Sequence, residues 1–527
     1  MKAMKKNYSV FLGAMLCFSL VSFAQPGSLD GDFDADGKVI TDIAGGYEYG
    51  FTVAIQQDGK IVVAGESDNQ IIVARYHPDG TMDNTFGLDG IVSTAITIFS
   101  WATGVVIQPD GKILIAGNTD FYDICVVRYN IDGSLDASFG TGGILTNNIG
   151  DQTYGSSIVL QTDGKILVAG YVETGGDYNF LVLRYNPSGS LDNTFSFDGI
   201  VNTDFNSRRD AASSIQVQID GKIVVAGYTA DPNNADDSDF ALTRYNADGS
   251  LDISFGTNGK VTTNYLAATY LWPESKDVAH SMALQPDGKI VVAGYLRGGL
   301  APYFHNFAVV RYNTDGTLDT SFAGSGKAFV NVSQNDNTAY SVALQADDKI
   351  VLAGRTWNGS DYDFAIVRLN TDASLDSIFG TNGKVITDIA IDQDECYSVV
   401  VQPDGRILAA GYATVSGTNR DIALARYLSG LNIGIVEFSE QNNAVLIYPN
   451  PIRDNAQLEF ELLNDDFIDI LLYNMQGVLV QEIKQNINLP KGQHSIALNF
   501  NNSLAAGNYL LVISGVAGKQ EIRIVKE

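Results

Sequence analysis

Short apolar runs separated by glycine, aspartate and asparagine fill the chain from about residue 28 to residue 428. In the first complete unit these runs are Thr52–Gln57, Lys60–Gly65, Ile71–Tyr76 and Ile91–Ala95. Runs of this length between turn residues are typical of β-strands. An Asp-Gly pair joins the first two runs and indicates a tight hairpin, since both residues accept positive φ. Each unit therefore predicts four antiparallel strands, called a to d below.

The unit recurs seven times. Its anchors are Gln-x-Asp-Gly-Lys after strand a, Ala-Gly in strand b, Arg-Tyr ending strand c, and Leu-Asp-x-x-Phe in the turn that follows. Successive units are 52 to 67 residues apart, and four strands at this period predict a β-propeller with seven blades rather than a solenoid. The sixth unit has Asp347-Asp348 in place of Asp-Gly, so we expect its turn to be the least well formed.

The two ends of the repeat complement each other. A lone d-type strand, Lys38–Asp42, precedes the first strand a, and the seventh unit stops after its strand c at Arg426-Tyr427. We predict that the N-terminal strand completes the last blade and closes the ring. Closure would remove the unpaired sheet edges of an open array.

One arginine and one aspartate recur in every unit. A charge repeated this regularly indicates a structural pair, in which a partly buried guanidinium bonds a carboxylate and turn carbonyls of its own repeat. The predicted structural pairs comprise Arg75, Arg128, Arg184, Arg244, Arg311, Arg368 and Arg426 with Asp30, Asp83, Asp136, Asp192, Asp252, Asp319 and Asp376.

Units such as 284–294 followed by 311–319 resemble the delta-60 repeat family of bacterial exported proteins. The resemblance covers roughly residues 28 to 428 and implies a propeller-like fold without catalytic activity. The predicted domains are a signal peptide (1–24), a seven-bladed propeller (25–430), a linker (431–443) and a small Ig-like β-sandwich (444–527). The signal peptide is predicted from a basic start, a short apolar run and small residues before Gln25.

The tail opens on Tyr-Pro-Asn-Pro and then carries a hairpin glycine and a Gly-x-Tyr strand; the residues are Tyr448, Pro449, Asn450, Pro451, Gly477, Gly507 and Tyr509. With this motif the tail resembles the C-terminal sorting domain of the type IX secretion system of Bacteroidetes-type bacteria. The resemblance implies export through Sec and then type IX secretion, a secreted or outer-membrane surface location, and the secretion machinery as partner. An ordinary Ig-like domain kept for stability is the alternative.

The formal charge of −28 argues against binding to nucleic acids or anionic membranes. No nucleophile elbow, phosphate loop or zinc spacing is present, so we predict no catalytic residue, metal or cofactor, and a protein that is not an enzyme. Asp32–Gly37 imitates the start of a calcium loop, but position twelve is Ile43 and not the required glutamate. Cys125 and Cys396 fall in the second and seventh repeats, which are not neighbours in a closed ring, so we predict free buried thiols.

The b to c and d to a loops vary among repeats and share one face of the predicted ring, where binding functions usually lie. Our hypothesis is that aromatic side chains of this face bind an extracellular glycan or protein. Packing at the blade entrances is the other interpretation of the same rings, and a secreted hydrolase with carboxylates in the channel is the alternative function. The candidate binding residues are Trp101, Trp272, Tyr303, Phe304 and Trp357.

Overall fold

A computed structural model gives the fold. It describes residues 25–526 except 44, 206, 266–275, 298–303, 417–418, 431–445, 449–451, 454, 463–465, 475–478, 501–503, 505–506 and 516–517. The predicted signal peptide and linker lie outside the described residues. The described residues are all-β, as predicted, and contain no helix that could cross a membrane.

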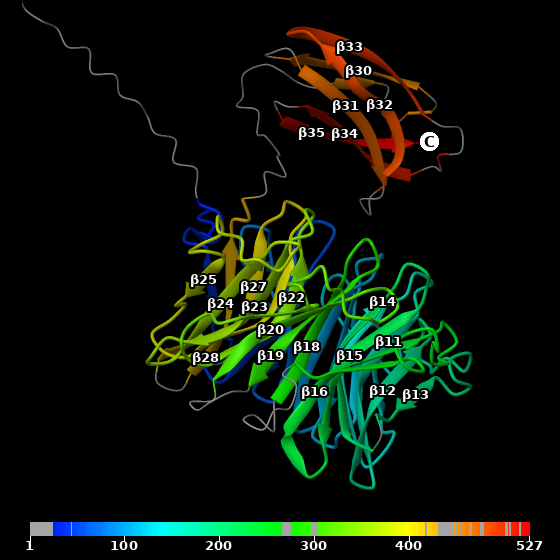
Figure 1. Cartoon of the computed structure of the whole chain (residues 1–527), viewed down its shortest axis with the longest axis vertical. Coiled ribbons are helices and arrows are strands. Elements are labelled where there is room, and N and C mark those ends of the chain that lie inside the picture. The colour runs from blue at the N-terminus through cyan, green and yellow to red at the C-terminus, as the bar shows by residue number, and fades with distance from the viewer. Residues whose placement is uncertain are drawn as a thin grey trace, which may run out of the picture.

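Seven four-stranded antiparallel sheets form the predicted seven blades (Figure 1). A single bridge between Ser238 and Lys276 joins the sheets of blades 4 and 5. Blade 1 comprises β2 (Glu48–Ile55), β3 (Ile61–Ser67), β4 (Gln70–Tyr76) and β5 (Ile91–Thr94); blade 2, β6 (Ser100–Ile107), β7 (Ile113–Thr119), β8 (Ile124–Tyr129) and β9 (Ile144–Asn147); blade 3, β10 (Gln152–Leu160), β11 (Ile166–Thr174), β12 (Asp177–Tyr185) and β13 (Ile200–Thr203); blade 4, β14 (Arg209–Val217), β15 (Ile223–Asp231), β16 (Asn234–Tyr245) and β17 (Lys260–Thr263); blade 5, β18 (Lys276–Leu284), β19 (Ile290–Arg297), β20 (His305–Tyr312) and β21 (Lys327–Val330); blade 6, β22 (Asn337–Leu344), β23 (Ile350–Trp357), β24 (Tyr362–Leu369) and β25 (Lys384–Thr387); and blade 7, β26 (Asp394–Val401), β27 (Ile407–Ser416), β28 (Asn419–Tyr427) and β1 (Lys38–Thr41).

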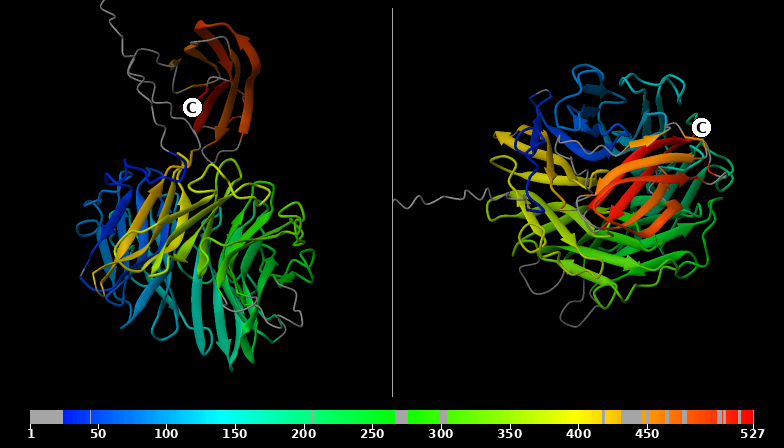
Figure 2. Two further views of the ribbon diagram at one scale, coloured as in Figure 1. Left: turned by 60° about the vertical axis from the view of Figure 1, so that its left-hand side comes forward. Right: turned by 90° about the horizontal axis from the view of Figure 1, so that it is seen from above.

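The N-terminal strand closes the ring as predicted. β1 pairs antiparallel with β28, from Lys38 opposite Ala425 to Thr41 opposite Ile422. The inner strands contact one another in the order β2, β6, β10, β14, β18, β22 and β26, and β26 contacts β2 again. In the view from above, the colours run round the circle until yellow meets blue (Figure 2). No blade is left without a neighbour.

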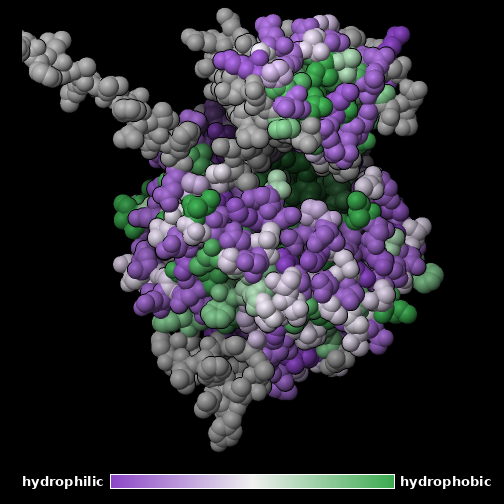
Figure 3. Space-filling model, turned by 45° about the horizontal axis from the view of Figure 1, so that its top comes forward, coloured by the Kyte–Doolittle hydropathy of each residue, from purple (hydrophilic) through white to green (hydrophobic). Residues whose placement is uncertain are grey.

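The core lies between adjacent blades. Strands b and c are apolar on both faces because each face packs against a neighbouring blade, as in β3, where six of seven residues are buried. The cluster that joins the last blade to the first contains Val63 and Ala74 from blade 1 and Leu408 and Leu424 from blade 7. Burying each such Leu or Val side chain contributes about 1.5–3 kcal/mol. The propeller surface visible in Figure 3 is mainly hydrophilic.

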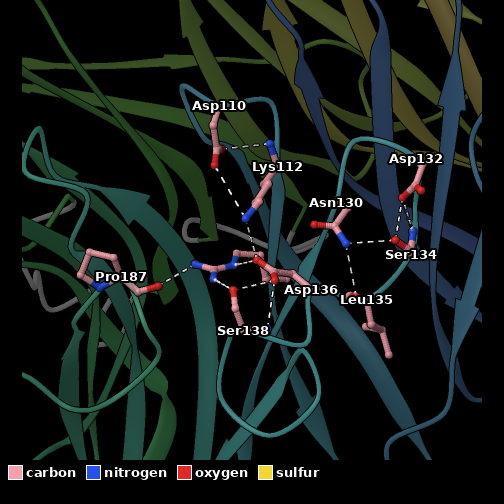
Figure 4. A network of polar contacts seen from close by, with 10 residues as sticks. Asp110, Lys112, Asn130, Asp132, Ser134, Leu135, Asp136, Ser138 and Pro187 are labelled. Atoms are coloured by element: carbon pink, nitrogen blue, oxygen red, sulfur yellow. Dashed lines mark hydrogen bonds and ion pairs between the residues drawn. The ribbon is translucent and has the colours of Figure 1, made fainter.

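The repeated arginine joins two blades. In blade 2, Nε of Arg128 donates to Oδ2 of Asp136 at 2.8 Å, and Nζ of Lys112 donates to the same oxygen at 2.9 Å (Figure 4). The Ser138 hydroxyl donates to the other carboxylate oxygen at 2.7 Å. Nη1 of Arg128 then reaches the carbonyl of Pro187 in blade 3, at 2.6 Å. The prediction that each arginine bonds within its own repeat is therefore incomplete, because the guanidinium has donors left for the next blade.

Every blade repeats the arginine–aspartate pair and the bond to a turn carbonyl, and blades 1 to 5 also repeat the turn hydroxyl. The arginine carbon Cζ also lies 4.4 to 4.6 Å from the ring of the phenylalanine in Leu-Asp-x-x-Phe, a cation–π contact. The lysine, arginine, aspartate and phenylalanine of the repeat thus meet at one network. The turn carbonyls that accept from the arginines of blades 1 to 7 belong to Ile131, Pro187, Ala247, Thr314, Thr371, Ser429 and Pro78.

In blade 7 the same network crosses the chain ends. Nε of Arg426 donates to Oδ2 of Asp30 at 2.8 Å, although 396 residues separate the two in sequence. Arg406, which stands where the other repeats have lysine, lies 2.7 Å from the same oxygen. Arg426 also donates to the carbonyl of Pro78 in blade 1. The N-terminal segment therefore supplies both a strand and a buried counter-charge to the last blade.

The sixth hairpin turn was expected to be the least well formed. This expectation is wrong, because its backbone makes the same hydrogen bond as the other turns. The N–H of Asp348 donates to the carbonyl of Gln345 at 2.9 Å, the same bond that Gly59 makes to Gln56. Asp348 adopts φ of 61°, and aspartate is one of the few residues that tolerate this left-handed region. Aspartate therefore substitutes for glycine without disrupting the turn.

The tail is a two-sheet sandwich, as predicted. One sheet has three strands and the other four, and Leu458, Ile470, Leu498 and Leu511 lie in the core between them. The strands are β29 (Leu446–Tyr448), β30 (Asn455–Leu462), β31 (Asp466–Asn474), β32 (Leu479–Leu489), β33 (Gly492–Asn499), β34 (Gly507–Gly515) and β35 (Gly518–Lys526).

Replacing the closing carboxylate tests the joint between the chain ends. We expect Asp30→Ala to lower the free energy of unfolding by about 3–5 kcal/mol, because Arg426 is left buried without its carboxylate. Asp32→Ala is the matched control, since the Asp32 side chain is 87% exposed, and should change stability by less than about 0.5 kcal/mol. Urea unfolding followed by fluorescence measures both. Equal stability of the two variants would contradict the role of Asp30.

We expect low pH to reduce the free energy of unfolding of the propeller. The Ser138 hydroxyl, Lys112 and the Ser138 N–H hold the pKa of Asp136 well below its usual 3.8, and the aspartates at 83, 192, 252 and 319 are shifted the same way. The unfolded chain therefore binds protons more readily, so the stability from these groups is present above pH 3.8 and is lost as pH falls below it. Urea unfolding at pH 7 and about pH 2.5 should show this loss, and Asp136→Asn should show a smaller one.

Candidate functional site at the channel entrance

A β-bulge interrupts every inner strand at the same position. In β22, for example, the pairing shifts between Ala339 and Ser341, which leaves Tyr340 as the extra residue. Bulges are frequent beside binding sites because they redirect a side chain. The extra residues of blades 1 to 7 are Phe51, Thr103, Ser156, Ser213, His280, Tyr340 and Tyr397.

The bulge explains the glycine of the Ala-Gly anchor. A Cβ on Gly354 would lie 1.9 Å from the carbonyl oxygen of Thr338 in the bulged strand, and one on Gly65 would lie 1.6 Å from that of Tyr49. Real Cβ atoms do not approach backbone oxygens so closely. Glycine is therefore required on strand b because the inner strand bulges towards it.

Four of the bulge residues form an aromatic arc. Ring centroids are 5.3 Å apart for Phe51 and Tyr397, 5.1 Å for Tyr397 and Tyr340, and 5.2 Å for Tyr340 and His280. These contacts connect blades 1, 7, 6 and 5 in order around the channel. The bulge residues of blades 2 to 4 are a threonine and two serines, so the opposite side of the channel has more open space.

Both carboxylate oxygens of Glu395, which lies beside the arc, have partners. Glu395 lies 2.5 Å from Nη1 of Arg355, and the Tyr397 hydroxyl donates to its other oxygen at 3.0 Å. The guanidinium of Arg355 also lies 4.1 Å from the ring centroid of Tyr362. Burial, followed by the charge of Glu395, raises the pKa of Tyr397, so its hydroxyl stays protonated. This network fills its side of the channel.

A pocket of about 400 Å³ opens beside blades 3 to 5, where the inner strand of blade 4 carries Ala211 and Ser213 in place of rings. Its wall is formed by four half-buried tyrosines together with cationic and imidazole side chains. We call it the tyrosine pocket; its characteristic lining residues are Tyr171, Tyr178, Tyr228, Tyr295, Arg209, Lys276 and His280.

The lining of the tyrosine pocket carries two cationic side chains, Arg209 and Lys276, and one carboxylate. The guanidinium of Arg209 lies 5.7 Å from the ring centroid of Tyr178. Burial, and then Arg355 and His305, lower the pKa of His280 to about 4, so its imidazole is neutral near pH 7. Asp210, the one carboxylate among the described lining residues, accepts the N–H of Phe205 at 2.6 Å. Burial raises the pKa of Asp210 to about 6.

A larger cavity of about 740 Å³ lies at the opposite ends of blades 4 and 5. It is lined by the hairpin turns at Asp220 and Asp287 and by Arg244, which are anchors that every blade repeats. Since these residues already serve the structural network, we assign the candidate site to the tyrosine pocket.

The structure separates the binding residues proposed from sequence. Trp101 belongs to the inner strand of blade 2, whereas Trp357 ends β23 of blade 6 and contacts Tyr362 edge-on at 5.0 Å. Phe304 is half-buried just before β20. Trp272 and Tyr303 lie outside the described residues. The described members therefore come from three different blades, and none lines the tyrosine pocket.

Sequence reasoning missed the four tyrosines, although a signal for three of them was present. The residue after Ala-Gly pairs with the inner strand just before the bulge and varies among blades. Aligning the repeats on Ala-Gly would have shown three consecutive tyrosines. The residues at this position are Glu66, Asn118, Tyr171, Tyr228, Tyr295, Arg355 and Tyr412.

Cys125 and Cys396 are buried and free. Of the sorting motif, Tyr448 ends β29 and its hydroxyl donates to Glu459 at 2.5 Å, and Gly507 and Tyr509 lie on β34. The other motif residues, Pro449, Asn450, Pro451 and Gly477, are outside the described residues.

Comparison with known families identifies both parts of the chain. Residues 446–527 match the secretion system C-terminal sorting domain. This tail assigns the chain to type IX export, to the cell surface or the medium, and implies contact with the secretion machinery. No curated protein matches the chain. The β-propeller domain of unknown function DUF5122 matches seven times, at residues 56–86, 108–139, 161–195, 218–255, 285–322, 345–379 and 402–432.

Solved structures with a similar chain path have low identity. Virginiamycin B lyase from Staphylococcus aureus is 13% identical, with 74% of this chain and 98% of that chain covered and a TM-score of 0.42. Polysaccharide lyase Uly1 is 9% identical, with 74% and 91% covered and a TM-score of 0.42. A protein of unknown function from Dyadobacter fermentans is 14% identical, with 74% and 98% covered and a TM-score of 0.39. At these values the likeness carries no argument about chemistry.

Replacing the glycine beside one bulge by alanine tests whether the bulged inner strand requires glycine on strand b. We expect Gly354→Ala to lower the free energy of unfolding by about 1–3 kcal/mol, because the new Cβ overlaps the carbonyl of Thr338. Gly31→Ala is the control, since its Cβ would meet nothing closer than 3.9 Å. Chemical denaturation compares the two. A neutral Gly354→Ala would show that the bulge does not require glycine.

Proposed function

We propose that this chain, which carries seven DUF5122 β-propeller repeats and a type IX sorting tail, binds an acidic extracellular glycan in the tyrosine pocket and does not alter it chemically. The observation that carries the proposal is the convergence of four tyrosines, Arg209 and Lys276 on one pocket of about 400 Å³. That volume lies within the usual range for small-ligand sites.

The tyrosines support a sugar ligand. Tyr171 stacks on Tyr154 at 4.7 Å, which holds it rigidly in the wall, and Tyr295 packs between His280 and His305. A rigid ring presents an apolar face to the C–H face of a pyranose and a hydroxyl to its polar groups. Little side-chain entropy is lost on binding because these rings are already held by neighbours.

The cations support an acidic ligand. The whole chain carries a formal charge of −28, yet the pocket wall contains Arg209 and Lys276 and a single carboxylate, Asp210. A cationic site on an acidic protein favours an anionic partner and repels cationic ones. Carboxylated or sulfated sugar units have the required charge, and a guanidinium can bind a carboxylate with two hydrogen bonds.

The carboxylates support binding without hydrolysis. Glycoside hydrolysis usually needs two carboxylates on either side of the bond that breaks. Asp210 is the one acid among the described lining residues, and its Oδ2 already accepts the Phe205 N–H. Glu395, on the other side of the channel, is held by Arg355 and Tyr397. The pocket therefore offers a binding surface and lacks the paired acids of the hydrolase alternative.

Titration with a defined acidic sugar tests the proposal. We expect hexagalacturonate to bind the purified protein in isothermal titration calorimetry, and neutral maltohexaose to bind at least about tenfold more weakly. Tyr228→Ala should weaken the binding of hexagalacturonate about tenfold by removing one stacking face. Arg209→Gln should weaken it and reduce its salt dependence, because one ion pair is lost.

Trp357→Ala is the control, since Trp357 lies in blade 6, away from the pocket lining. It should bind hexagalacturonate as the unaltered protein does. Loss of binding in Trp357→Ala with retention in Tyr228→Ala would instead favour the tryptophan residues proposed from sequence. Shortened or unsaturated products after prolonged incubation, seen by mass spectrometry, would contradict the non-catalytic role.

A further inference from the structure

Three carboxylates meet at the junction of blades 6 and 7. Asp363 lies on β24, Asp388 follows β25, and Asp394 begins the inner strand β26 of the next blade. One oxygen from each lies within 4.8 Å of the other two. Asp363 and Asp394 are buried and Asp388 is exposed, so the cluster has a buried floor and an open side.

A buried oxygen in this cluster lacks a donor. Asp394 is fully buried, and its Oδ2 accepts the N–H groups of Ile389 at 2.6 Å and Ala390 at 3.0 Å. Its Oδ1 is also buried and has no hydrogen-bond partner. An acceptor withdrawn from water without a partner is costly. A ligand with positive charge would satisfy it.

The neighbouring groups do not neutralise the cluster. Nδ2 of Asn358 donates to Oδ2 of Asp363 at 3.0 Å, which adds a dipole but no charge. Nζ of Lys38 donates to the main-chain carbonyl of Asp388 at 2.6 Å. None of the ion pairs between described residues involves the three carboxylates. Like charges at this separation repel one another unless a cation lies between them.

The fold does not require three acids here. At the junction of blades 5 and 6, Asn337 takes the place of Asp394 and accepts the loop N–H of Ser333 at 3.0 Å. At the junction of blades 2 and 3, the amide of Asn148 donates to Asp123 at 2.7 Å, so a neutral group lies where a second acid would be. Asparagine side chains can therefore make the hydrogen bonds that hold this loop. The fold does not need three carboxylates at the junction of blades 6 and 7.

We propose that Asp363, Asp388 and Asp394 bind a divalent cation, with Ca²⁺ as the ion of choice. Carboxylates are hard oxygen ligands of the kind that Ca²⁺ prefers, and exported modules commonly bind it with Kd values of about 10⁻⁴–10⁻³ M. The ion links the outer strands of blade 6 to the inner strand of blade 7. Calcium thus stabilises a blade junction next to the point of ring closure.

A second acidic cluster, Asp42, Glu48 and Asp421, lies at the next junction, between blades 7 and 1. It differs because the Ser67 hydroxyl already donates to Oε1 of Glu48 at 3.2 Å. We do not assign a cation to this second cluster.

Calcium titration of the full exported protein tests the site after removal of metal with EGTA. We expect CaCl₂ to bind with a Kd of about 10⁻⁴–10⁻³ M and to raise the melting temperature. Asp388→Asn should weaken this binding at least tenfold. The variant should fold normally, since Asp388 is exposed and asparagine occupies its place after β17 and β21. Asp394→Asn, which imitates Asn337, should give the same loss.

Asp204→Asn is the matched control. Asp204 occupies the place of Asp388 at the junction of blades 3 and 4, where Asn179 stands in for the third acid, and it is exposed as well. This variant should bind calcium as the unaltered protein does. Absence of binding and of any thermal shift at about 5 mM CaCl₂ would overturn the proposal. Binding by Asp388→Asn that equals that of Asp204→Asn would do so too.

Discussion

The buried arginine that ends strand c determines how the blades fit together. Its Nε bonds the aspartate of its own blade and its Nη1 bonds a turn carbonyl of the next, so it fixes both the shape of one blade and its position against the neighbour. A phenylalanine, a second cation (lysine, or Arg406 in blade 7) and, in blades 1 to 5, a turn hydroxyl complete the same network. Because a guanidinium left without these partners would be very costly to bury, each blade depends on the next, and the last depends on Asp30 near the start of the ring.

The arginine network fixes the blades at the face of the ring that carries the a to b and c to d turns. Residues towards the opposite face are therefore free to vary. The repeated bulge directs one inner-strand side chain per blade towards the channel, and the Ala-Gly anchor leaves room for it. Since that side chain has no role in the structural network, it can be a ring in four adjacent blades and a small hydroxyl in three. The unequal arrangement closes one side of the channel and opens the tyrosine pocket on the other, so a nearly symmetric scaffold carries a single asymmetric site.

The sequence was sufficient for the fold because the anchors lie in fixed order and the spare strand at one end matches the missing strand at the other. It was insufficient for the bond from Arg128 to Pro187, since a contact between blades depends on how neighbouring turns approach in space. The binding site was harder still. Trp101 and Trp357 stood out as rare residues, yet Tyr171, Tyr228 and Tyr295 converge only because a bulge and two small residues in blade 4 open the space between them. The meeting of Asp363, Asp388 and Asp394 likewise depends on three strands from two blades.

Native-state hydrogen exchange of the β1 amides tests most directly whether the chain ends close the ring. If β1 is an integral strand of blade 7, the amides of Val39 and Thr41, which face β28, will exchange with the same free energy of opening as those of β28 itself. Exchange of β1 at a far lower free energy, while β28 stays protected, would show that the strand frays independently and that the ring is held together without it.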